Sequence, residues 1–254
     1  MGNTDKARVL VILPARFGST RFPGKPLADL CGKPLIWHAY EAVSGVPGVD
    51  RVVVATDDQR IADAVTDRGG DAIITTGDHA TGTDRLAEVA ERIDSEIYVN
   101  VQGDEILSTP DMLAPLVAAF LEDDSLTVGT LCHPLDDLAD LNNPNVVKVV
   151  RDHDGFALYF SRSQIPFVRE PGAHLKVPHG LFSRHFGIYI YRKQALLAFP
   201  GLPYSTLEDM EKLEQLRFLQ AGFRIKVLTT EHSAYRVDTP GDLDDVARRM
   251  AAGH

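Results

Sequence analysis

The chain has 254 residues, 36 acidic against 26 basic side chains, a formal net charge of −10 at pH 7 and two cysteines. This length suits one large α/β domain with a substantial core, and the acidic balance argues against nucleic acid, which demands a basic face. No apolar run approaches the roughly 18 residues that cross a bilayer, and neither a secretory leader nor a Cys/His cluster for zinc is visible. We therefore expect a cytoplasmic protein that binds neither nucleic acid nor membranes.

Strands and helices are predicted to alternate through the first half of the chain. Apolar and β-branched runs predict strands at 8–13, 51–56, 72–75 and 96–101. Apolar residues at helical spacing predict helices at 34–43, around 61–65, at 84–93 and from 110 to 120, the last opened by Thr109 and Pro110. This alternation predicts an α/β fold, with a mostly parallel central sheet and helices on both faces.

The second half is predicted to leave this pattern. Runs at 146–150 and 156–161 flank a turn that contains glycine and predict a β-hairpin, and further strands are expected at 186–191 and 224–229. A capping box at Ser205–Glu208 predicts one long helix that ends near Gly222, and Thr239 with Pro240 begins the last helix. Because no repeat or linker interrupts the chain, we expect a single domain over 1–254 with a β-hairpin excursion around 146–191.

The segment that joins the first strand to the first helix, residues 14–26, is the strongest candidate for a ligand site. It is longer than the usual connection of about two to six residues, and it contains Arg16, Arg21 and Lys25 among glycines and hydroxyls. Ligands of doubly wound sheets bind where such loops lie, and glycine N–H groups with three cations suit a polyphosphate. The segment matches neither a Walker A nor a G-x-G-x-x-G motif, and a solvated basic loop is the alternative.

Two aspartates are candidates for a magnesium site. Asp104 follows a predicted strand in the motif Gln102-Gly103-Asp104-Glu105, where a carboxylate that faces phosphates suits Mg²⁺. A turn stabilised by glycine and aspartate explains the same residues equally well. Asp238 precedes the last helix and is either a second metal ligand or, as its spacing favours, a helix cap.

Weaker candidates are polar residues near other predicted element ends. The loop 78–85 suits a base or a sugar, or simply caps the following helix. Residues that suit a polar acceptor, or an ordinary surface, are Arg184, His185, Glu211, Glu214 and Gln215. The absence of G-x-S-x-G and H-E-x-x-H motifs argues against hydrolases of those two kinds.

With these motifs in view, the chain resembles the 3-deoxy-manno-octulosonate (Kdo) cytidylyltransferases, or CMP-Kdo synthetases, from about Val9 to Met250. The matching stretches are PARFGSTRFPGKPL, VVVATDD, DHATGTDRLAEV, YVNVQGDE, NPNVVKVV, ALYFSRSQIP, RHFGIYIYR, LEDMEKLEQLR and VDTP. The resemblance implies a glycosyltransferase-A-like nucleotidyltransferase fold, a homodimer with the excursion as a dimerisation element, and Mg²⁺ as cofactor. It also implies transfer of CMP from CTP to the anomeric hydroxyl of Kdo, with release of pyrophosphate.

The resemblance assigns roles residue by residue. It implies nucleotide binding by Pro14, Ala15, Arg16, Arg21, Lys25, Thr81, Gly82, Arg85 and Asp104. It implies binding of the sugar acid by Gln102, Arg162, His185, Tyr189, Glu211, Glu214 and Gln215. Asp104 and Asp238 would hold Mg²⁺, and the catalytic set would be Arg16, Lys25, Asp104 and Asp238.

The chain departs from the family at residues 106–109, where Ile-Leu-Ser-Thr stands in place of the usual proline and apolar residues. Because this segment follows the candidate metal ligand, a related 2-keto sugar acid is an alternative acceptor, such as an amino-substituted Kdo or a sialic-acid-like acid. A glycosyltransferase-like enzyme is a further alternative, although no D-x-D triplet ends YVNVQGDE. A non-catalytic nucleotide-binding module would not need both paired carboxylates and a cationic loop.

Overall fold

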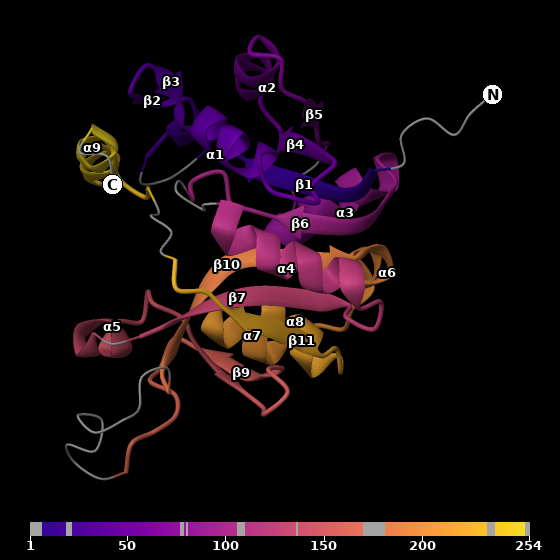
Figure 1. The fold of residues 1–254 in the computed structure, drawn as a ribbon, viewed down its shortest axis with the longest axis vertical. Coiled ribbons are helices and arrows are strands. Elements are labelled where there is room, and N and C mark those ends of the chain that lie inside the picture. Colours follow the sequence, from indigo (N-terminus) through magenta and orange to yellow (C-terminus); the bar gives the residue numbers. More distant parts are fainter. Residues whose placement is uncertain are drawn as a thin grey trace.

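The computed structural model describes residues 7–18, 22–76, 79, 81–105, 110–135, 137–169, 181–232 and 237–251. Within these ranges a nine-stranded sheet forms the centre of the molecule, with the main order β11-β7-β10-β6-β1-β4-β5 (Figure 1). Its strands are β1 (Ala7–Ala15), β4 (Arg51–Thr56), β5 (Ala72–Ile74), β6 (Ser95–Asn100), β7 (Val128–Pro134), β8 (Lys148–Arg151), β9 (Ala157–Ser161), β10 (Ser183–Arg192) and β11 (Ile225–Thr229). No helix of the described residues is both long and apolar enough to cross a membrane.

The sheet combines parallel and antiparallel pairs. Strands β5, β4, β1 and β6 run parallel to one another, and β11 runs parallel to β7. Strand β10 is antiparallel to both β6 and β7 and joins the two groups, and β8 extends from it to pair with β9. The predicted β-hairpin at 146–161 is β8–β9, whereas residues 186–191, which the predicted excursion included, belong to β10 of the main sheet. The predicted mostly parallel sheet is confirmed.

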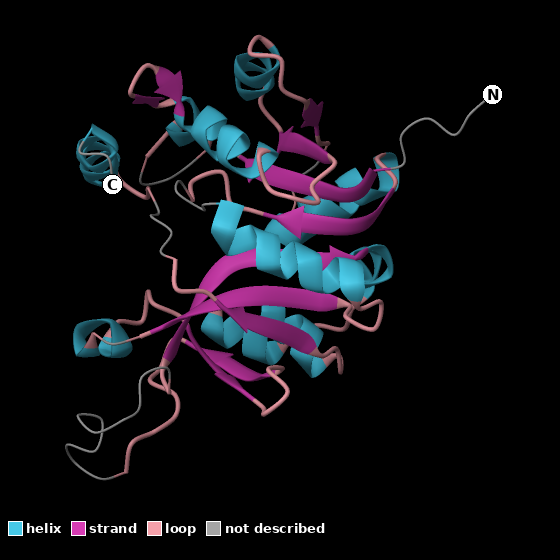
Figure 2. Ribbon diagram, viewed as in Figure 1, coloured by secondary structure: helices cyan, strands magenta, loops and turns pink. Residues whose placement is uncertain are grey.

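Burial on both faces explains why β1 reads as a continuous apolar run. Residues Val9 to Leu13 are completely buried. Val9, Val11 and Leu13 belong to the core under α1 (Leu35–Ser44), α2 (Gln59–Thr66) and α4 (Pro110–Glu122). Leu10 and Ile12 belong to the opposite core, under α3 (Gly82–Arg92) and α6 (Lys193–Ala198). Helices therefore cover both faces, as predicted and as Figure 2 shows.

The prediction of one long helix between Ser205 and Gly222 is wrong. The segment forms two short helices, α7 (Thr206–Glu211) and α8 (Gln215–Gln220), separated at Lys212, whose φ of 52° and ψ of 49° are left-handed. The hydroxyl of Ser205 does cap α7, accepting from the N–H of Glu208 at 3.0 Å. The Glu208 carboxylate, however, accepts two 2.6 Å hydrogen bonds from Arg217. After the break, Leu213, Gln215, Leu216 and Phe218 are buried.

Several elements are absent from the prediction. The largest is β7, a buried central strand whose sequence, VGTLCHP, contains glycine, threonine and proline. Gly129 is needed there because a Cβ atom would lie 2.6 Å from the Phe120 ring, but glycine also weakens the strand pattern. The shorter ones are η1 (Lys25–Leu27), β2 (Asp29–Leu30), β3 (Lys33–Pro34), α5 (Leu138–Asn142), α6 (Lys193–Ala198) and η3 (Phe199–Gly201).

The last helix, α9 (Pro240–Ala251), lies beside the β2–β3 hairpin rather than on the main sheet (Figure 1). Val246 of α9 and Val237 ahead of it share a small core with Leu30 and Leu35. The C-terminal segment therefore returns to the part of the fold that follows β1. The predicted helix opening at Thr109 lies outside the described residues.

Candidate active site

Two adjoining pockets lie where β1, β6 and β10 meet. The first, called here the cationic pocket, has a volume of about 400 Å³, and the second, called the acceptor pocket, about 410 Å³. The residues of the predicted nucleotide and metal sets that line the cationic pocket are Pro14, Ala15, Arg16, Lys25, Thr81, Gly82, Arg85, Asp104 and Asp238. Arg21 of the same set lies outside the described residues. Gln102 and Glu214 line both pockets and form their common wall.

A tight turn brings Lys25 back toward the end of β1. Gly24 has φ 71° and donates its N–H to the carbonyl of Phe17 at 3.0 Å. Glycine accommodates this left-handed conformation without the steric cost of a side chain. The turn places Lys25 at the start of η1, from which its side chain reaches the cationic pocket.

The ammonium of Lys25 lies between the two predicted metal ligands. Its Nζ donates to Asp104 Oδ2 in a short ion pair, lies 3.6 Å from Asp238 Oδ1 and donates to the carbonyl of Val237 at 3.0 Å. The N–H of Val237 in turn donates to the carbonyl of Asp104 at 3.1 Å. This backbone link holds the segment before α9 against the end of β6. Two carboxylates that are far apart in the sequence thus face one cation.

The chemistry of this pair fits Mg²⁺. Both carboxylates supply hard oxygens and are only 14% and 26% exposed, and a positive group already lies between them. No group of three or more His, Cys, Asp or Glu side chains that could hold a metal occurs among the described residues. Mg²⁺ commonly uses only one or two protein carboxylates and takes its other ligands from water and substrate phosphates. The pair therefore suits a metal that arrives with a phosphorylated ligand.

The other two cations of the pocket are held in different ways. Arg16 is exposed and donates from Nη2 to the carbonyl of His79 at 3.0 Å. Arg85 of α3 is 1% exposed, and its Nη2 lies 2.8 Å from Asp57 Oδ2 while its Nη1 donates to Thr75 Oγ1 at 2.5 Å. Asp57 therefore orients a buried guanidinium at the pocket wall.

The N-terminus of α3 meets the wall that both pockets share. Thr81 and Asp84 form a capping box, so the loop before α3 caps the helix as well as lining the pocket. The carboxylate of Glu214 accepts from the N–H groups of Gly82 at 3.3 Å and Thr83 at 3.1 Å. Because unpaired N–H groups at a helix start attract negative charge, this contact joins the α7–α8 segment to the cationic pocket.

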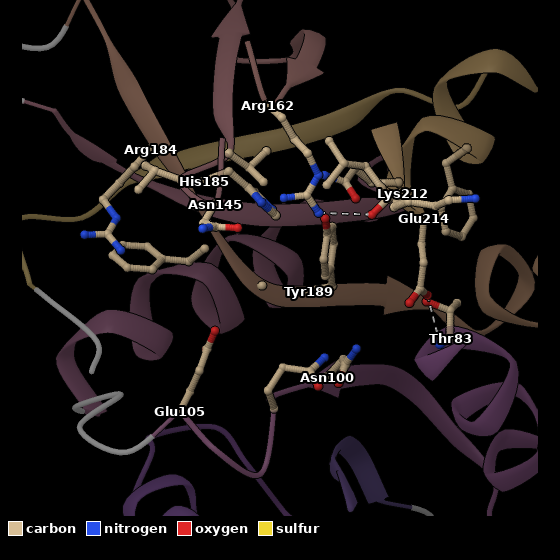
Figure 3. A pocket seen from close by; sticks show the side chains of 18 of the residues that line it. Thr83, Asn100, Glu105, Asn145, Arg162, Arg184, His185, Tyr189, Lys212 and Glu214 are labelled. Carbon is tan, nitrogen blue, oxygen red and sulfur yellow. Dashed lines mark hydrogen bonds between the residues drawn. The ribbon is translucent and has the colours of Figure 1, made fainter. Parts of the chain in front are cut away.

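The acceptor pocket lies along β10 (Figure 3). Members of the predicted sugar-acid set that line it are Gln102, Arg162, His185, Tyr189, Glu214 and Gln215. Glu211 lines neither pocket, and its carboxylate accepts from Ser161 Oγ at 2.6 Å and from the N–H of Arg162 at 2.9 Å. Arg162 also donates from Nε to the Glu211 carbonyl at 2.6 Å. Glu211 thus positions Arg162 through its carboxylate and its carbonyl, without itself lining the pocket.

His185 is neutral in this pocket. Its Nε2 lies 3.0 Å from Thr130 Oγ1, and its ring packs edge-on against Phe160 with centroids 5.0 Å apart. His185 lines the acceptor pocket. Burial removes water from its ring and lowers the pKa of His185 to about 3. It can therefore exchange hydrogen bonds with hydroxyls, but it carries no charge for a carboxylate near pH 7.

Tyr189 presents a polar atom to which the described part of the chain gives no hydrogen-bond partner. Its buried hydroxyl makes no hydrogen bond within the described part of the chain, and the amide nitrogen of Gln215 and Nε of Arg184 share this property. Burial also raises the pKa of Tyr189 well above its ordinary value, so the phenol stays protonated. Buried unpaired polar groups are costly unless a ligand or water pairs with them.

The predictions missed some lining residues of the acceptor pocket, namely Asn100, Asn145, Tyr191 and Lys212. Asn100 carried a usable signal, because it is an amide at the end of a strand, directly after the apolar residues Ile97 to Val99. Asn145 and Lys212 lie in loops whose local patterns give no reason to expect them here. The left-handed backbone at Lys212 brings its carbonyl within 3.4 Å of Arg162 Nη2 (Figure 3).

Comparisons of the sequence with known proteins all point to cytidylyltransferases. The sequence profile of the cytidylyltransferase family matches residues 10–226. The 3-deoxy-manno-octulosonate cytidylyltransferase of Trichlorobacter lovleyi is 50% identical over 251 residues, which cover 97% of this chain and 100% of that protein. Its counterpart in Syntrophotalea carbinolica is 53% identical over 239 residues, which cover 92% of this chain and 95% of that protein.

Solved structures show the same relationship. A CMP:2-keto-3-deoxy-manno-octonic acid synthetase in complex with CTP superimposes with a TM-score of 0.91 at 42% identity and covers 97% of this chain and 100% of its own. A 4-diphosphocytidyl-2C-methyl-D-erythritol synthase from Anaerococcus prevotii has a TM-score of 0.62 at 15% identity, with 96% of each chain covered. The second likeness shows a shared nucleotidyltransferase fold only.

Proposed function

The chain belongs to the 3-deoxy-manno-octulosonate cytidylyltransferase family, and on that premise we propose that it transfers CMP from CTP to the anomeric hydroxyl of Kdo and releases pyrophosphate. One observation carries the proposal. A pocket with cations and paired carboxylates shares the wall of Gln102 and Glu214 with a second pocket of mostly neutral polar groups. Such an arrangement brings a triphosphate and a polyhydroxylated acceptor together end to end.

The nucleotide occupies the cationic pocket in this proposal. Arg16, Lys25 and the backbone of Pro14 and Ala15 surround the place for the phosphates, and Arg21 belongs to the same loop. The residues proposed to seat the cytidine are Thr81, Gly82 and Arg85, on or before α3. Their fixed backbone and the buried guanidinium support a role in orientation.

We propose that Asp104 and Asp238 hold Mg²⁺ with CTP. When bound, the ion supplies positive charge to the phosphates and lowers the pKa of a coordinated hydroxyl. The protein contributes the two carboxylates and the backbone link from Val237 to Asp104 that keeps them together. The proximity of both carboxylates to one ammonium supports this assignment.

The sugar acid occupies the acceptor pocket, with its reacting end toward the shared wall. Arg162 is a cation placed for the acceptor carboxylate, and Tyr189 and Gln215 offer buried donors for its other oxygens. His185 suits a neutral hydroxyl, because its ring is uncharged. This division gives the acid group and the hydroxyl groups different partners.

The protein acts by positioning and by charge compensation. The anomeric oxygen forms a bond to the α-phosphorus as the bond to pyrophosphate breaks, and the proton of the hydroxyl passes to solvent water. No covalent protein intermediate is required. Arg16 and Lys25 offset negative charge on the transferring and leaving phosphates.

The alternative acceptors gain no support. Both relatives described above carry the name of the Kdo enzyme at about half identity over almost the whole chain. The departure at 106–109 lies outside the described residues. A glycosyltransferase-like reaction is likewise not favoured by these relatives.

The decisive experiment offers Kdo, 8-amino-Kdo and a sialic acid with each of the four nucleoside triphosphates and Mg²⁺, and identifies the products by mass spectrometry. We expect pyrophosphate and CMP-Kdo from CTP with Kdo, and neither product when the sugar acid is omitted. Product with another acid alone would replace Kdo as the acceptor, and no product with any acid would reject the proposed activity.

We also propose the homodimer that the family resemblance implies, with the excursion around 146–191 at its interface. Leu158 of β9 is 62% exposed, and Phe167 and Leu181 nearby in the sequence are 83% and 47% exposed. An interface formed by the excursion would cover these exposed apolar side chains. Light scattering of wild type and of Leu158→Lys tests this: a dimer that the substitution weakens supports it, and a monomeric wild type rejects it.

A further inference from the structure

Lys25 occupies the space between the two carboxylates that are proposed to hold the metal ion. Its ammonium contacts Asp104 and lies 3.6 Å from Asp238 Oδ1, so it takes the place of a cation between the two carboxylates. Lys25 and Asp104 are only 13% and 14% exposed, so water screens this charge pair weakly. An ion pair shielded in this way is harder to exchange than one on the surface.

An ammonium and a divalent cation cannot share this place. Mg²⁺ binds carboxylate oxygens at about 2.0–2.1 Å, which would bring it into the space that Lys25 Nζ occupies against Asp104. Two positive charges a few ångström apart also repel each other. A metal held by Asp104 Oδ2 together with Asp238 would therefore require the Lys25 side chain to move.

The surrounding structure confines that movement to the side chain. Gly24 donates to the Phe17 carbonyl at 3.0 Å, and Ala28 donates to the Lys25 carbonyl at 3.0 Å, so η1 holds the backbone on both sides. The long, flexible stem of a lysine allows its ammonium to turn from the carboxylates toward the rest of the cationic pocket. A triphosphate placed in that pocket supplies the negative charge that would draw it there.

We propose that Lys25 is a resident counter-cation of Asp104 and Asp238 and that the nucleotide makes the metal site available by drawing this ammonium onto its phosphates. The identity of the nucleotide rests on the proposed function, but the exchange rests on the Lys25 contacts alone. Nucleotide and metal then bind cooperatively, because each favours the same displaced position of Lys25. In the free protein, Lys25 keeps metal affinity low.

The test measures Mn²⁺ binding to the nucleotide-free protein by electron paramagnetic resonance, so it needs no turnover. We expect Lys25→Met to bind Mn²⁺ at least about tenfold more tightly than wild type, because a competing positive charge has gone. Lys25→Gln serves as a second neutral variant if Lys25→Met folds poorly. Adding Asp104→Asn to either variant should remove the gain, which locates the ion between the carboxylates.

Arg16→Met is the matched control. It removes one positive charge from the same pocket, but Arg16 bonds to the carbonyl of His79 rather than to a carboxylate of the pair. We expect its Mn²⁺ affinity to stay within about twofold of wild type, since the long-range effect of an exposed charge is screened. A similar gain in Arg16→Met would attribute the effect to net charge and overturn the exchange.

Equal Mn²⁺ affinity of wild type and a folded neutral Lys25 variant would also overturn it. If the wild type still makes CMP-Kdo in that case, only the exchange fails and the proposed function stands. Conversely, the neutral Lys25 variants could gain Mn²⁺ affinity while the wild type makes no CMP-Kdo. That result would leave the exchange intact and reject the proposed function.

Discussion

The carboxylate of Glu214 accepts a hydrogen bond from the backbone N–H of Gly82 at 3.3 Å, although 132 positions separate the two residues along the chain. This contact occurs at the wall that both pockets share. It attaches the α7–α8 segment, which carries part of the acceptor pocket, to the helix that carries Arg85. A change at Glu214 should therefore affect both substrates.

We expect Glu214→Ala to raise the KM for CTP and for Kdo together and to cost about 1 kcal/mol of unfolding free energy, the usual range for a lost helix-start contact. Steady-state kinetics and urea unfolding measure the two effects. The control is Asp58→Ala, which removes the cap of α2 and should lower stability without changing either KM. An unchanged KM for either substrate in Glu214→Ala would contradict this coupling.

Asp104→Asn should reduce kcat by at least about a thousandfold while the protein stays folded, because it removes a charged oxygen ligand where charge must be neutralised. Pyrophosphate release and circular dichroism give the two readings. Asp111→Asn, an exposed change in the first turn of α4, serves as the control and should retain activity. Near-normal turnover in Asp104→Asn would reject the metal role.

His185 should make folding stability depend on pH. Its pKa is lowered to about 3 in the folded protein from an ordinary 6.5, so between these values the unfolded chain binds more protons. Stability therefore falls as pH decreases below about 6.5, by about 1–2 kcal/mol at pH 5 from this residue. Urea unfolding of wild type and His185→Gln at pH 5 and pH 7 isolates the effect. A difference between the two proteins that does not change with pH would refute it.

Asp57→Asn should raise the KM for CTP severalfold and leave the KM for Kdo unchanged. The substitution removes the negative partner of the buried Arg85, which we propose to seat the cytidine. The free energy of unfolding should also fall, by about 1–3 kcal/mol, because the buried charge of Arg85 loses its carboxylate partner and keeps only neutral hydrogen-bond acceptors. Asp71→Asn is the control, because Asp71 pairs with the exposed Arg51. Equal effects of both substitutions on the KM for CTP would contradict a positioning role.

Local patterns placed many residues of the candidate site at the ends of strands, because apolar runs show where a strand stops. The apolar runs at β1 and β6 placed the loop of Lys25 and the motif of Asp104 at the correct edge of the sheet. Their meeting with Asp238 depends on a backbone hydrogen bond from Val237 to Asp104. Contacts between distant segments leave no periodic signal, so from the residues alone Asp238 read better as a cap.

The acceptor pocket was harder to predict from its residues. The apolar spacing of Leu213, Leu216 and Leu219 continues through the segment, which is why one long helix was expected. The break at Lys212 requires a left-handed backbone, which a lysine adopts only at a cost. Tertiary contacts, including the bonds between Arg162 and the carbonyls of Glu211 and Lys212, accompany that conformation. Such contacts outweigh local helix propensity.

Strand β1 offers a way to observe the two layers of the molecule separately. Leu10 packs toward the layer of α3, and Val11, its neighbour, packs toward the layer of α1 and α4. Isotope-labelled methyl groups at these adjacent positions would report to nuclear magnetic resonance on opposite sides of one backbone. A nucleotide that disturbs the Leu10 signal more than the Val11 signal would reveal which layer senses its arrival.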